Sequence, residues 1–296
     1  MSAMTLNSLG NLDSAQNRLD EARQHYEEAL KILRQLVRQN PEKYLLDLAL
    51  ALSDLGKVDK SQNRLEEARQ HVEEALENFR QLMQENPDKY LPYVARTLSN
   101  LGVLDVDQNR AEDARQHYEE ALKILRPLAQ QNPDAYLPYV ARTLNNLGTL
   151  EKDQHGREEE ARQHYEEALK IRRQLTNQDP EMYLPYLANT LNGLGVLDSD
   201  QNRMEEARQH YEEALKIRRQ LGQQNPETYL VDVAQTLNNL GNLDKAQNRI
   251  EEARSHYRQA ISVYQELSKG NPNRYAADIA GILFVLANLE QNDTDK

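Results

Sequence analysis

The chain has 296 residues, no cysteine, no tryptophan, only two phenylalanines and a net charge of −12. The absence of cysteine excludes disulfides, zinc sites built from thiolates and thiol nucleophiles, and the negative charge argues against a nucleic acid partner because phosphates would be repelled. No apolar run could span a bilayer and the first residues lack the features of a signal peptide, so no membrane contact and a cytoplasmic location are predicted.

The first predicted helix contains a Leu-Gly pair, and this pair recurs along the chain at a nearly constant spacing. It stands at Leu9-Gly10, Leu55-Gly56, Leu101-Gly102, Leu147-Gly148, Leu194-Gly195 and Leu240-Gly241. All steps are 46 residues except one of 47, where His155-Gly156 adds a residue and so marks a loop. A fixed period of this kind predicts a repeat protein, in which each unit buries its apolar stripe only against its neighbours.

Each unit is predicted to hold two antiparallel helices, called helix A and helix B. Apolar residues spaced three and four apart run from Leu137 to Leu150 in one helix A, and from Ala22 to Val37 in one helix B. No strand pattern is present, so the predicted fold is an all-α solenoid forming a single domain. Its predicted repeats are 1–40, 41–86, 87–132, 133–179, 180–225 and 226–271, followed by a C-terminal helix and tail at 272–296.

Turn and capping residues set the limits of the predicted helices. The turn after helix A is expected to use the left-handed conformation at Asn17, Asn63, Asn109, Gly156, Asn202 and Asn248. Asn or Asp followed by Pro is expected to cap the next helix A at residues 40, 86, 132, 179, 225 and 271. A glycine inside a helix costs about 1 kcal/mol, so each Leu-Gly glycine is expected to allow close packing, as of Gly148 against Ala161 and Tyr165.

The repeated residues resemble those of the tetratricopeptide repeat family. In the third unit they are Leu98, Leu101, Gly102, Ala114, Tyr118 and Ala121, and all six units match, with Val72 in place of the tyrosine in the second. The units are about a dozen residues longer than the common form and are similar to those of kinesin light chain and of bacterial arrays. The resemblance implies a right-handed superhelix with helix A on the concave face, and a scaffold that binds proteins or peptides without catalysis or cofactors.

A histidine recurs in every helix B and could suggest a metal or catalytic site. Equivalent histidines lie two helices apart, and packed helices are about 8–10 Å apart, so the stripe cannot converge on one ion. His25 has no nucleophile beside it, and the histidines are therefore predicted to pack or to cap a charge between repeats. Asp105–Asn109 and Asp198–Asn202 resemble the start of a calcium loop, but the glycine and glutamate that such a loop needs are missing. No metal is predicted.

A polar row on helix A is the predicted peptide-binding site. Two residues before each Leu-Gly pair stand Asn7, Ser53, Ser99, Asn145, Asn192 and Asn238. Near them on the same face are Arg96, Arg142, Asn11, Thr149, Val196 and Asn242. An asparagine amide can donate to and accept from the backbone of an extended peptide, and an arginine can hold an acidic side chain. The alternative is that these are solvated helix positions with no ligand.

The two ends of the array suggest a second hypothesis. Met4, Leu6 and Leu9 would lack half their packing, so either further residues precede them or another surface covers them. The seventh unit is apolar nearly all round, and Leu283, Phe284 and Val285 are predicted to form an interface unless they simply belong to an exposed cap. On this reading the array is a structural, sensor or dimerisation arm of a larger signalling protein, with a homodimer formed through the terminal helices.

Overall fold

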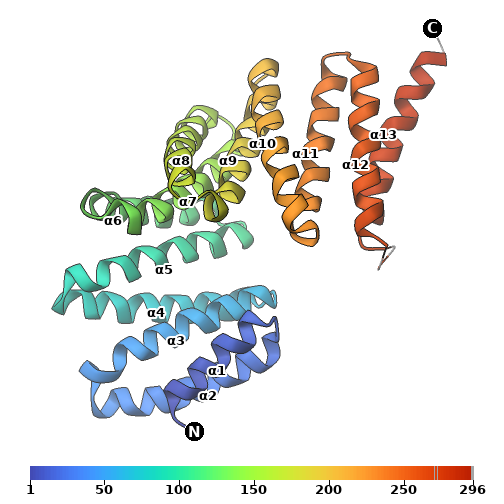
Figure 1. The fold of residues 1–296 in the computed structure, drawn as a ribbon. Coiled ribbons are helices and arrows are strands. Elements are labelled where there is room, and N and C mark those ends of the chain that lie inside the picture. Colours follow the sequence, from blue (N-terminus) through green and yellow to red (C-terminus); the bar gives the residue numbers. More distant parts are fainter. Residues whose placement is uncertain (270, 272, 295–296) are drawn as a thin grey trace. The chain divides into compact units, whose positions relative to one another are not determined.

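The computed structural model describes residues 1–269, 271 and 273–294, with side chains described as far as Leu289. Within these residues every regular element is an α-helix, and the helices follow one another in pairs (Figure 1). The predicted segments 226–271 and 272–296 include residues 270, 272, 295 and 296, which lie outside the described residues. The prediction of an all-α helical repeat solenoid is confirmed.

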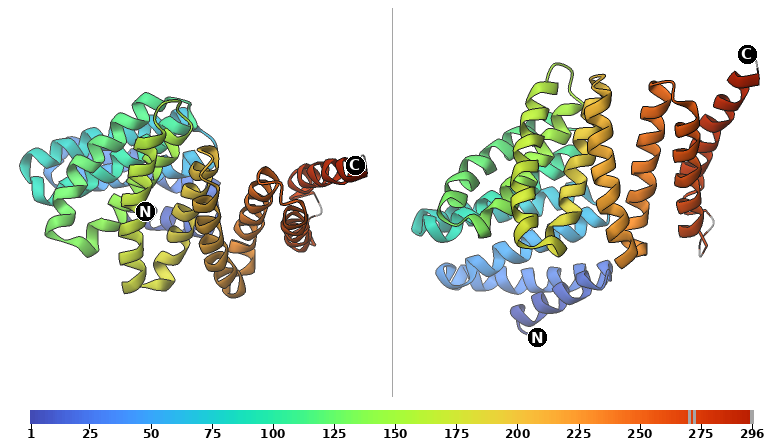
Figure 2. Two further views of the ribbon diagram at one scale, coloured as in Figure 1. Left: turned by 90° about the horizontal axis from the view of Figure 1, so that it is seen from above. Right: turned by 45° about the horizontal axis from the view of Figure 1, so that its top comes forward.

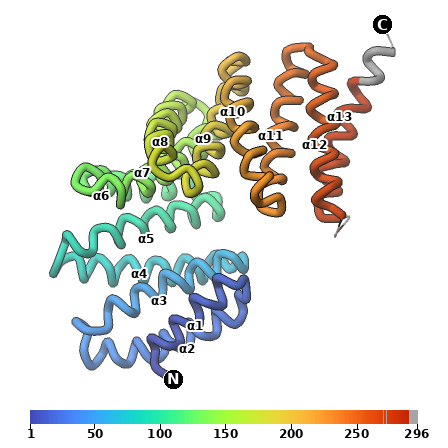
Figure 3. The backbone as a smooth tube through the Cα atoms, viewed as in Figure 1, coloured from blue at the N-terminus to red at the C-terminus, as the bar shows by residue number. Residues whose placement is uncertain are grey.

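Helices A and B alternate along the chain, as the tube in Figure 3 traces from one end to the other. The A helices are α1 (Ala3–Ala15), α3 (Pro41–Ser61), α5 (Pro87–Asp107), α7 (Pro133–Lys152), α9 (Pro180–Asp200) and α11 (Pro226–Ala246). The B helices are α2 (Leu19–Gln39), α4 (Leu65–Glu85), α6 (Ala111–Gln131), α8 (Glu158–Gln178), α10 (Met204–Gln224) and α12 (Ile250–Leu267). A further helix, α13 (Ala276–Thr294), follows.

The chain divides into two compact units, Met1–Leu150 and Glu151–Lys296. In the first unit α1 to α6 pack each against the next, and in the second α8 to α13 do the same, which Figure 2 shows from two further directions. Each helix buries one stripe, because the faces of neighbouring helices are its only source of apolar contact. In the second unit one continuous core extends from Ala207 and Tyr211 to Leu286 and Leu289.

Five of the six predicted caps are present, and so are the predicted turns. The sixth cap, expected at Asn271, is not formed, because the next helix, α13, begins only at Ala276. Asn40 Oδ1 accepts the backbone N–H of Lys43 at 3.1 Å, and residues 86, 132, 179 and 225 cap their helices in the same way. The turn residues have positive φ angles, at 58° to 59° for the asparagines and 82° for Gly156. Asparagine and glycine tolerate this left-handed conformation better than other residues, so the A–B turn is encoded locally.

The glycine of the Leu-Gly pair allows helices A and B to approach closely. A methyl group at Gly102 would lie 2.5 Å from Cε1 of Tyr118, and Gly241 has the same relationship to Tyr257 at 2.7 Å. Both tyrosines are buried. The prediction that this position is small because helix B packs directly against it is confirmed for these repeats.

Candidate functional site

A buried acid on helix A joins neighbouring repeats and explains the recurring histidine. Asp59, which is fully buried, accepts from Arg23 Nε of the preceding helix B at 2.9 Å and lies 2.8 Å from Nδ1 of His71 in its own repeat. In the second unit Asp198 is held in the same way by Arg162 and His210. The histidines therefore cap a buried carboxylate at the contact between repeats, which is one of the two roles that the sequence predicted.

The surroundings of Asp198 favour its charged form. Burial raises the pKa of this carboxyl. The hydrogen bonds and charges of His210 and Arg162 together lower it by more, so the net pKa is below its ordinary value. His117 shows the reverse effect, because burial and the charge of Arg69 lower the pKa of its imidazole. Asp198, Arg162 and His210 thus bond to one another and join neighbouring repeats.

Most side chains of the predicted polar row are half-buried or exposed. We define the helix-A face of the first unit as the surface formed by Asn7, Asn11, Arg96, Arg142, Asn145 and Thr149. The helix-A face of the second unit is the surface formed by Asn192, Asn238 and Asn242. Asn7, Arg96, Arg142, Asn145, Asn192 and Asn238 are half-buried, whereas Asn11, Thr149 and Asn242 are exposed. These side chains are therefore placed at or near the surface, where a ligand could reach them.

Several predicted site residues are engaged within the protein. Ser99 is only 2% exposed and its hydroxyl lies 3.0 Å from Oγ1 of Thr143, so it packs between α5 and α7 beneath the surface. The amide oxygen of Asn11 accepts the hydroxyl of Tyr26 at 2.7 Å. Asn242 Oδ1 does the same for the equivalent tyrosine of its own repeat. The asparagine amides that make these bonds have a fixed orientation.

The helix-A face of the first unit contains a pocket that sequence reasoning missed. We call it the tyrosine pocket; its volume is about 380 Å³ and it is lined by Lys89, Pro92, Tyr93, Arg96, Leu125, Ala135, Tyr136 and Tyr139. The Arg96 guanidinium lies 5.4 Å from the ring centre of Tyr93, and that of Arg142 lies 5.5 Å from the ring centre of Tyr139. The lining contains two cations and no carboxylate, in a chain of net charge −12.

A motif in the sequence could have revealed these tyrosines. Tyr-Leu-Pro-Tyr occurs at 90–93, 136–139 and 183–186, in the first two turns of α5, α7 and α9. Its second tyrosine lies three residues before Arg96, Arg142 or Asn189, so both fall on the same side of the helix. The motif is absent from the helices at 41–61 and 226–246, which distinguishes the middle repeats from their neighbours.

The second unit has two buried arginines that sequence reasoning also missed. Arg172 and Arg218 are each 5% exposed and lie at a position of helix B that is apolar in the other repeats. Arg172 Nη1 donates to the backbone oxygen of Tyr186 at 2.5 Å and also to Oγ1 of Thr190. Burial lowers the pKa of Arg172 to about 10 and also lowers that of Arg218. The signal in the sequence is Ile-Arg-Arg where the first and third repeats have Ile-Leu-Arg.

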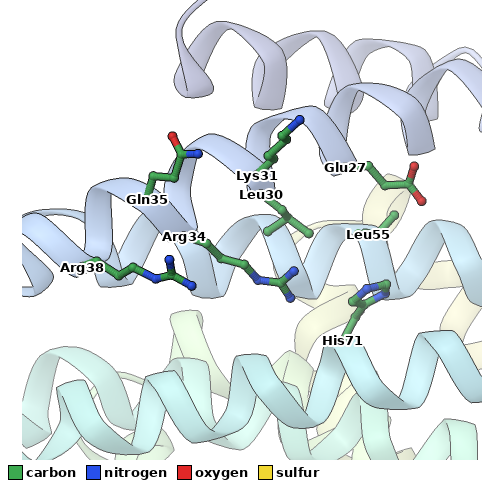
Figure 4. A pocket seen from close by; sticks show the side chains of 8 residues that line it. All are labelled: Glu27, Leu30, Lys31, Arg34, Gln35, Arg38, Leu55 and His71. Carbon is green, nitrogen blue, oxygen red and sulfur yellow. The ribbon is translucent and has the colours of Figure 1, made fainter.

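A different kind of groove lies between successive B helices. In the first unit its volume is about 430 Å³, and Figure 4 shows its lining by Glu27, Leu30, Lys31, Arg34, Gln35, Arg38, Leu55 and His71. The equivalent groove in the second unit includes Arg219 and His256. Arg34 is paired with Glu74 at 2.7 Å, and Arg219 donates to Gln259 at 2.9 Å. These grooves recur because the repeat recurs, and they show no feature specific to one ligand.

The predicted interface residues lie on α13. Leu283 is 50% exposed and Phe284 is 70% exposed, whereas Val285 packs against the core of the second unit. Two of the three residues therefore form an uncovered apolar surface.

The described part of the chain contains neither a metal site nor a membrane span. In that part no three His, Asp or Glu side chains are placed so that they could hold one ion. None of its helices combines the length and the apolar character needed to cross a bilayer.

Comparison with known proteins agrees with the geometry. One tetratricopeptide repeat model matches residues 3–81, 126–174 and 186–266, and a second matches residues 94–126. No curated protein matches the sequence.

Solved structures share the fold over most of the chain. BtubC (BKLC) from P. vanneervenii is 25% identical, with a TM-score of 0.67 over 86% of this chain and 94% of that one. The pilF protein of Pseudomonas aeruginosa is 19% identical, with a TM-score of 0.57 over 95% and 96% of the two chains. The assembly chaperone of RpL4 (Acl4) is 16% identical, with a TM-score of 0.63 over 99% and 100%. From the helix pairs, the packing of glycine against tyrosine and these matches, the chain belongs to the tetratricopeptide repeat family.

Proposed function

We propose that this tetratricopeptide repeat scaffold binds an extended segment of a partner protein along the helix-A face of a unit. The observation that carries the proposal is the tyrosine pocket of the first unit, which combines an apolar floor at Leu125 with tyrosine rings and two cations. A pocket with apolar walls and a few placed polar groups is the usual form of a binding site. Binding of this kind requires no catalytic group.

The half-buried asparagines support the proposal from the same surface. Asn7, Asn145, Asn192 and Asn238 carry amides that can satisfy the backbone N–H and C=O groups of an extended chain. Arg96 and Arg142 can supply charge-assisted hydrogen bonds to its side chains. Asn11, Thr149 and Asn242 extend the polar surface by one helical turn, while buried Ser99 supports it from below.

Selection of peptides from a random display library tests this function. The full chain is compared with the Arg96→Ala/Asn145→Ala variant and with Arg34→Ala, a matched control that removes an exposed arginine from the other side of the first unit. We expect the helix-A variant to lose the selected peptides and the control to keep them, at equal helicity. If the selected peptides bind the helix-A variant as well as they bind the unaltered chain, the proposal is wrong.

The exposed apolar surface of α13 supports a second candidate function, a dimerisation arm of a larger protein. Leu283 and Phe284 would be covered by a second copy of the chain in this case. The test is the mass of the full chain in solution by light scattering, alone and as Phe284→Ser. A dimer that the substitution converts to a monomer supports this candidate, and a monomer at all concentrations contradicts it.

A further inference from the structure

The second unit places a cation where other repeats place a core side chain. The position of Arg218 on helix B is occupied in other repeats by Leu33, Phe79, Leu125 and Tyr264, all of which are buried. Burying a guanidinium is costly unless it is paired, so a core position that changes from leucine to arginine needs a compensating role. The geometry around Arg218 indicates what that role is.

All acceptors of Arg218 are neutral groups. Its Nη2 donates to Oδ1 of Asn189 at 2.9 Å, and its Nη1 donates to Oδ1 of Asn192 at 3.2 Å and to Oγ1 of Thr236 at 2.5 Å. The same Nη1 donates to the backbone oxygen of Asp232 at 3.2 Å. The Asp232 carboxylate lies near enough to stabilise the charge but makes no salt bridge with Arg218 among the described residues.

These bonds fix the orientation of two asparagine amides. Both amide oxygens point toward Arg218, and the oxygen of Asn192 also accepts from Nδ2 of Asn239 at 3.3 Å. The Nδ2 groups of Asn189 and Asn192 must then point the other way, because an amide presents its oxygen and nitrogen on opposite sides. Neither Nδ2 has an acceptor in the part of the chain that the structure describes.

The result is a site that offers two amide donors beside a buried guanidinium, whose charge has no salt bridge among the described residues and is offset only at longer range by Asp232. Asn189 is exposed and Asn192 is half-buried, and both lie on α9 at the surface where the helix-A face of the second unit begins. We propose that Arg218 positions Asn189 and Asn192 to bind the carboxylate of an acidic side chain in the partner segment, an inference that rests on the proposed function. In a chain of net charge −12, anions are repelled elsewhere, so a local positive site selects where an acidic residue can bind.

Two substitutions remove this site in different ways. Arg218→Leu places at this position the residue that the first and third repeats use, and so keeps an apolar core. Asn189→Asp keeps the oxygen that Arg218 needs but replaces the outward donor with a negative charge. Because Asn189 is exposed, this second variant keeps the fold and carries the test even if Arg218→Leu does not fold. Arg219→Leu is the matched control, since it removes the neighbouring charge on the exposed side of α10.

The experiment is selection from a random peptide display library against the full chain and these three variants. We expect peptides selected by the full chain and by Arg219→Leu to share an Asp or Glu at one position, and this preference to disappear with Arg218→Leu and Asn189→Asp. Changing that acid to its amide in a selected peptide should weaken binding to the full chain about tenfold and leave binding to Arg218→Leu unchanged.

Two outcomes overturn the inference, and they differ in what else they overturn. Peptides that depend on helix-A residues but show no acidic preference, or keep that preference with Asn189→Asp, refute this inference and leave the proposed function intact. Peptides that bind all helix-A variants equally refute the proposed function and this inference together.

Discussion

The Nη2 atom of Arg162 on α8 lies 2.6 Å from Oδ1 of Asp198 on α9, so an ion pair joins helix B of one repeat to helix A of the next. The carboxylate is fully buried and the arginine side chain is only 9% exposed. A buried pair contributes little over an apolar contact, but the loss of one partner is costly because the other charge stays buried.

Removal of the carboxylate charge should destabilise the second unit. Asp198→Asn leaves Arg162 without its buried counter-charge, and we expect a loss of about 3 kcal/mol in the free energy of unfolding. Urea unfolding followed by circular dichroism measures it. Glu166→Gln is the control, because Glu166 is the exposed partner of the same arginine at 3.9 Å and should change stability by less than about 0.5 kcal/mol. Equal effects of the two substitutions would contradict the role given to Asp198.

The same carboxylate should make stability depend on acid pH. The pKa of Asp198 is below its ordinary value of 3.8 in the folded chain, so its contribution is complete above that value and is lost as the pH falls through the folded pKa. The urea concentration at the unfolding midpoint of the unaltered protein should therefore decrease once the pH is lowered below about 4. The difference in midpoint between it and Asp198→Asn should shrink over the same range. A difference that stays constant to the lowest pH would show that Asp198 does not titrate in this way.

The Leu-Gly glycine should not tolerate a side chain. In Gly102→Ala the new methyl group would lie 2.5 Å from the ring of Tyr118, and we expect a loss of about 1–3 kcal/mol in the free energy of unfolding. Gly281→Ala on α13 is the matched control, since nothing lies within 4 Å of its new methyl group. There the better helix propensity of alanine should raise stability by up to about 1 kcal/mol. Thermal unfolding of both variants gives the comparison.

The contribution of a helix-B tyrosine hydroxyl to stability should depend on whether that hydroxyl makes a hydrogen bond. Tyr257 donates to Asn242 Oδ1 at 2.7 Å, and burial raises its pKa to about 12. Tyr211 occupies the same position of the previous repeat, but its hydroxyl has no protein partner among the described residues. Tyr257→Phe should cost about 1 kcal/mol, and Tyr211→Phe should be nearly neutral. Chemical denaturation distinguishes them, and a larger loss for Tyr211→Phe would be inconsistent with this hydrogen-bond pattern.

Features encoded by local pattern could be predicted from the sequence. The asparagine turns, the caps and the contact of Gly102 with Tyr118 all follow from rules that involve a few neighbouring residues and the repeat period. The role of the histidines could also be predicted, because the spacing of packed helices excludes their convergence on a metal. Repetition strengthened these predictions, since any interpretation had to hold at several positions at once.

Features that break the repeat were harder to predict. Arg172 and Arg218 stand where the first and third repeats have leucine, but only the packing shows that both arginine side chains stay buried. Ser99 was grouped with the asparagines by register, yet a short side chain at this position packs against Thr143 and stays buried. The tyrosine pocket depends on three helices of two neighbouring repeats, a relationship that the sequence of one helix does not contain.

The ion pairs between repeats have a consequence for how such genes change length. In four repeats an arginine of helix B reaches an aspartate 36 residues further along, as Arg23 reaches Asp59 and Arg162 reaches Asp198. A block of 46 residues therefore carries one aspartate for the repeat before it and one arginine for the repeat after it. Recombination that removes or duplicates a whole block leaves every buried acid with a counter-charge. Selection can thus lengthen or shorten the array in whole repeats, whereas a partial deletion would leave a buried charge without its partner.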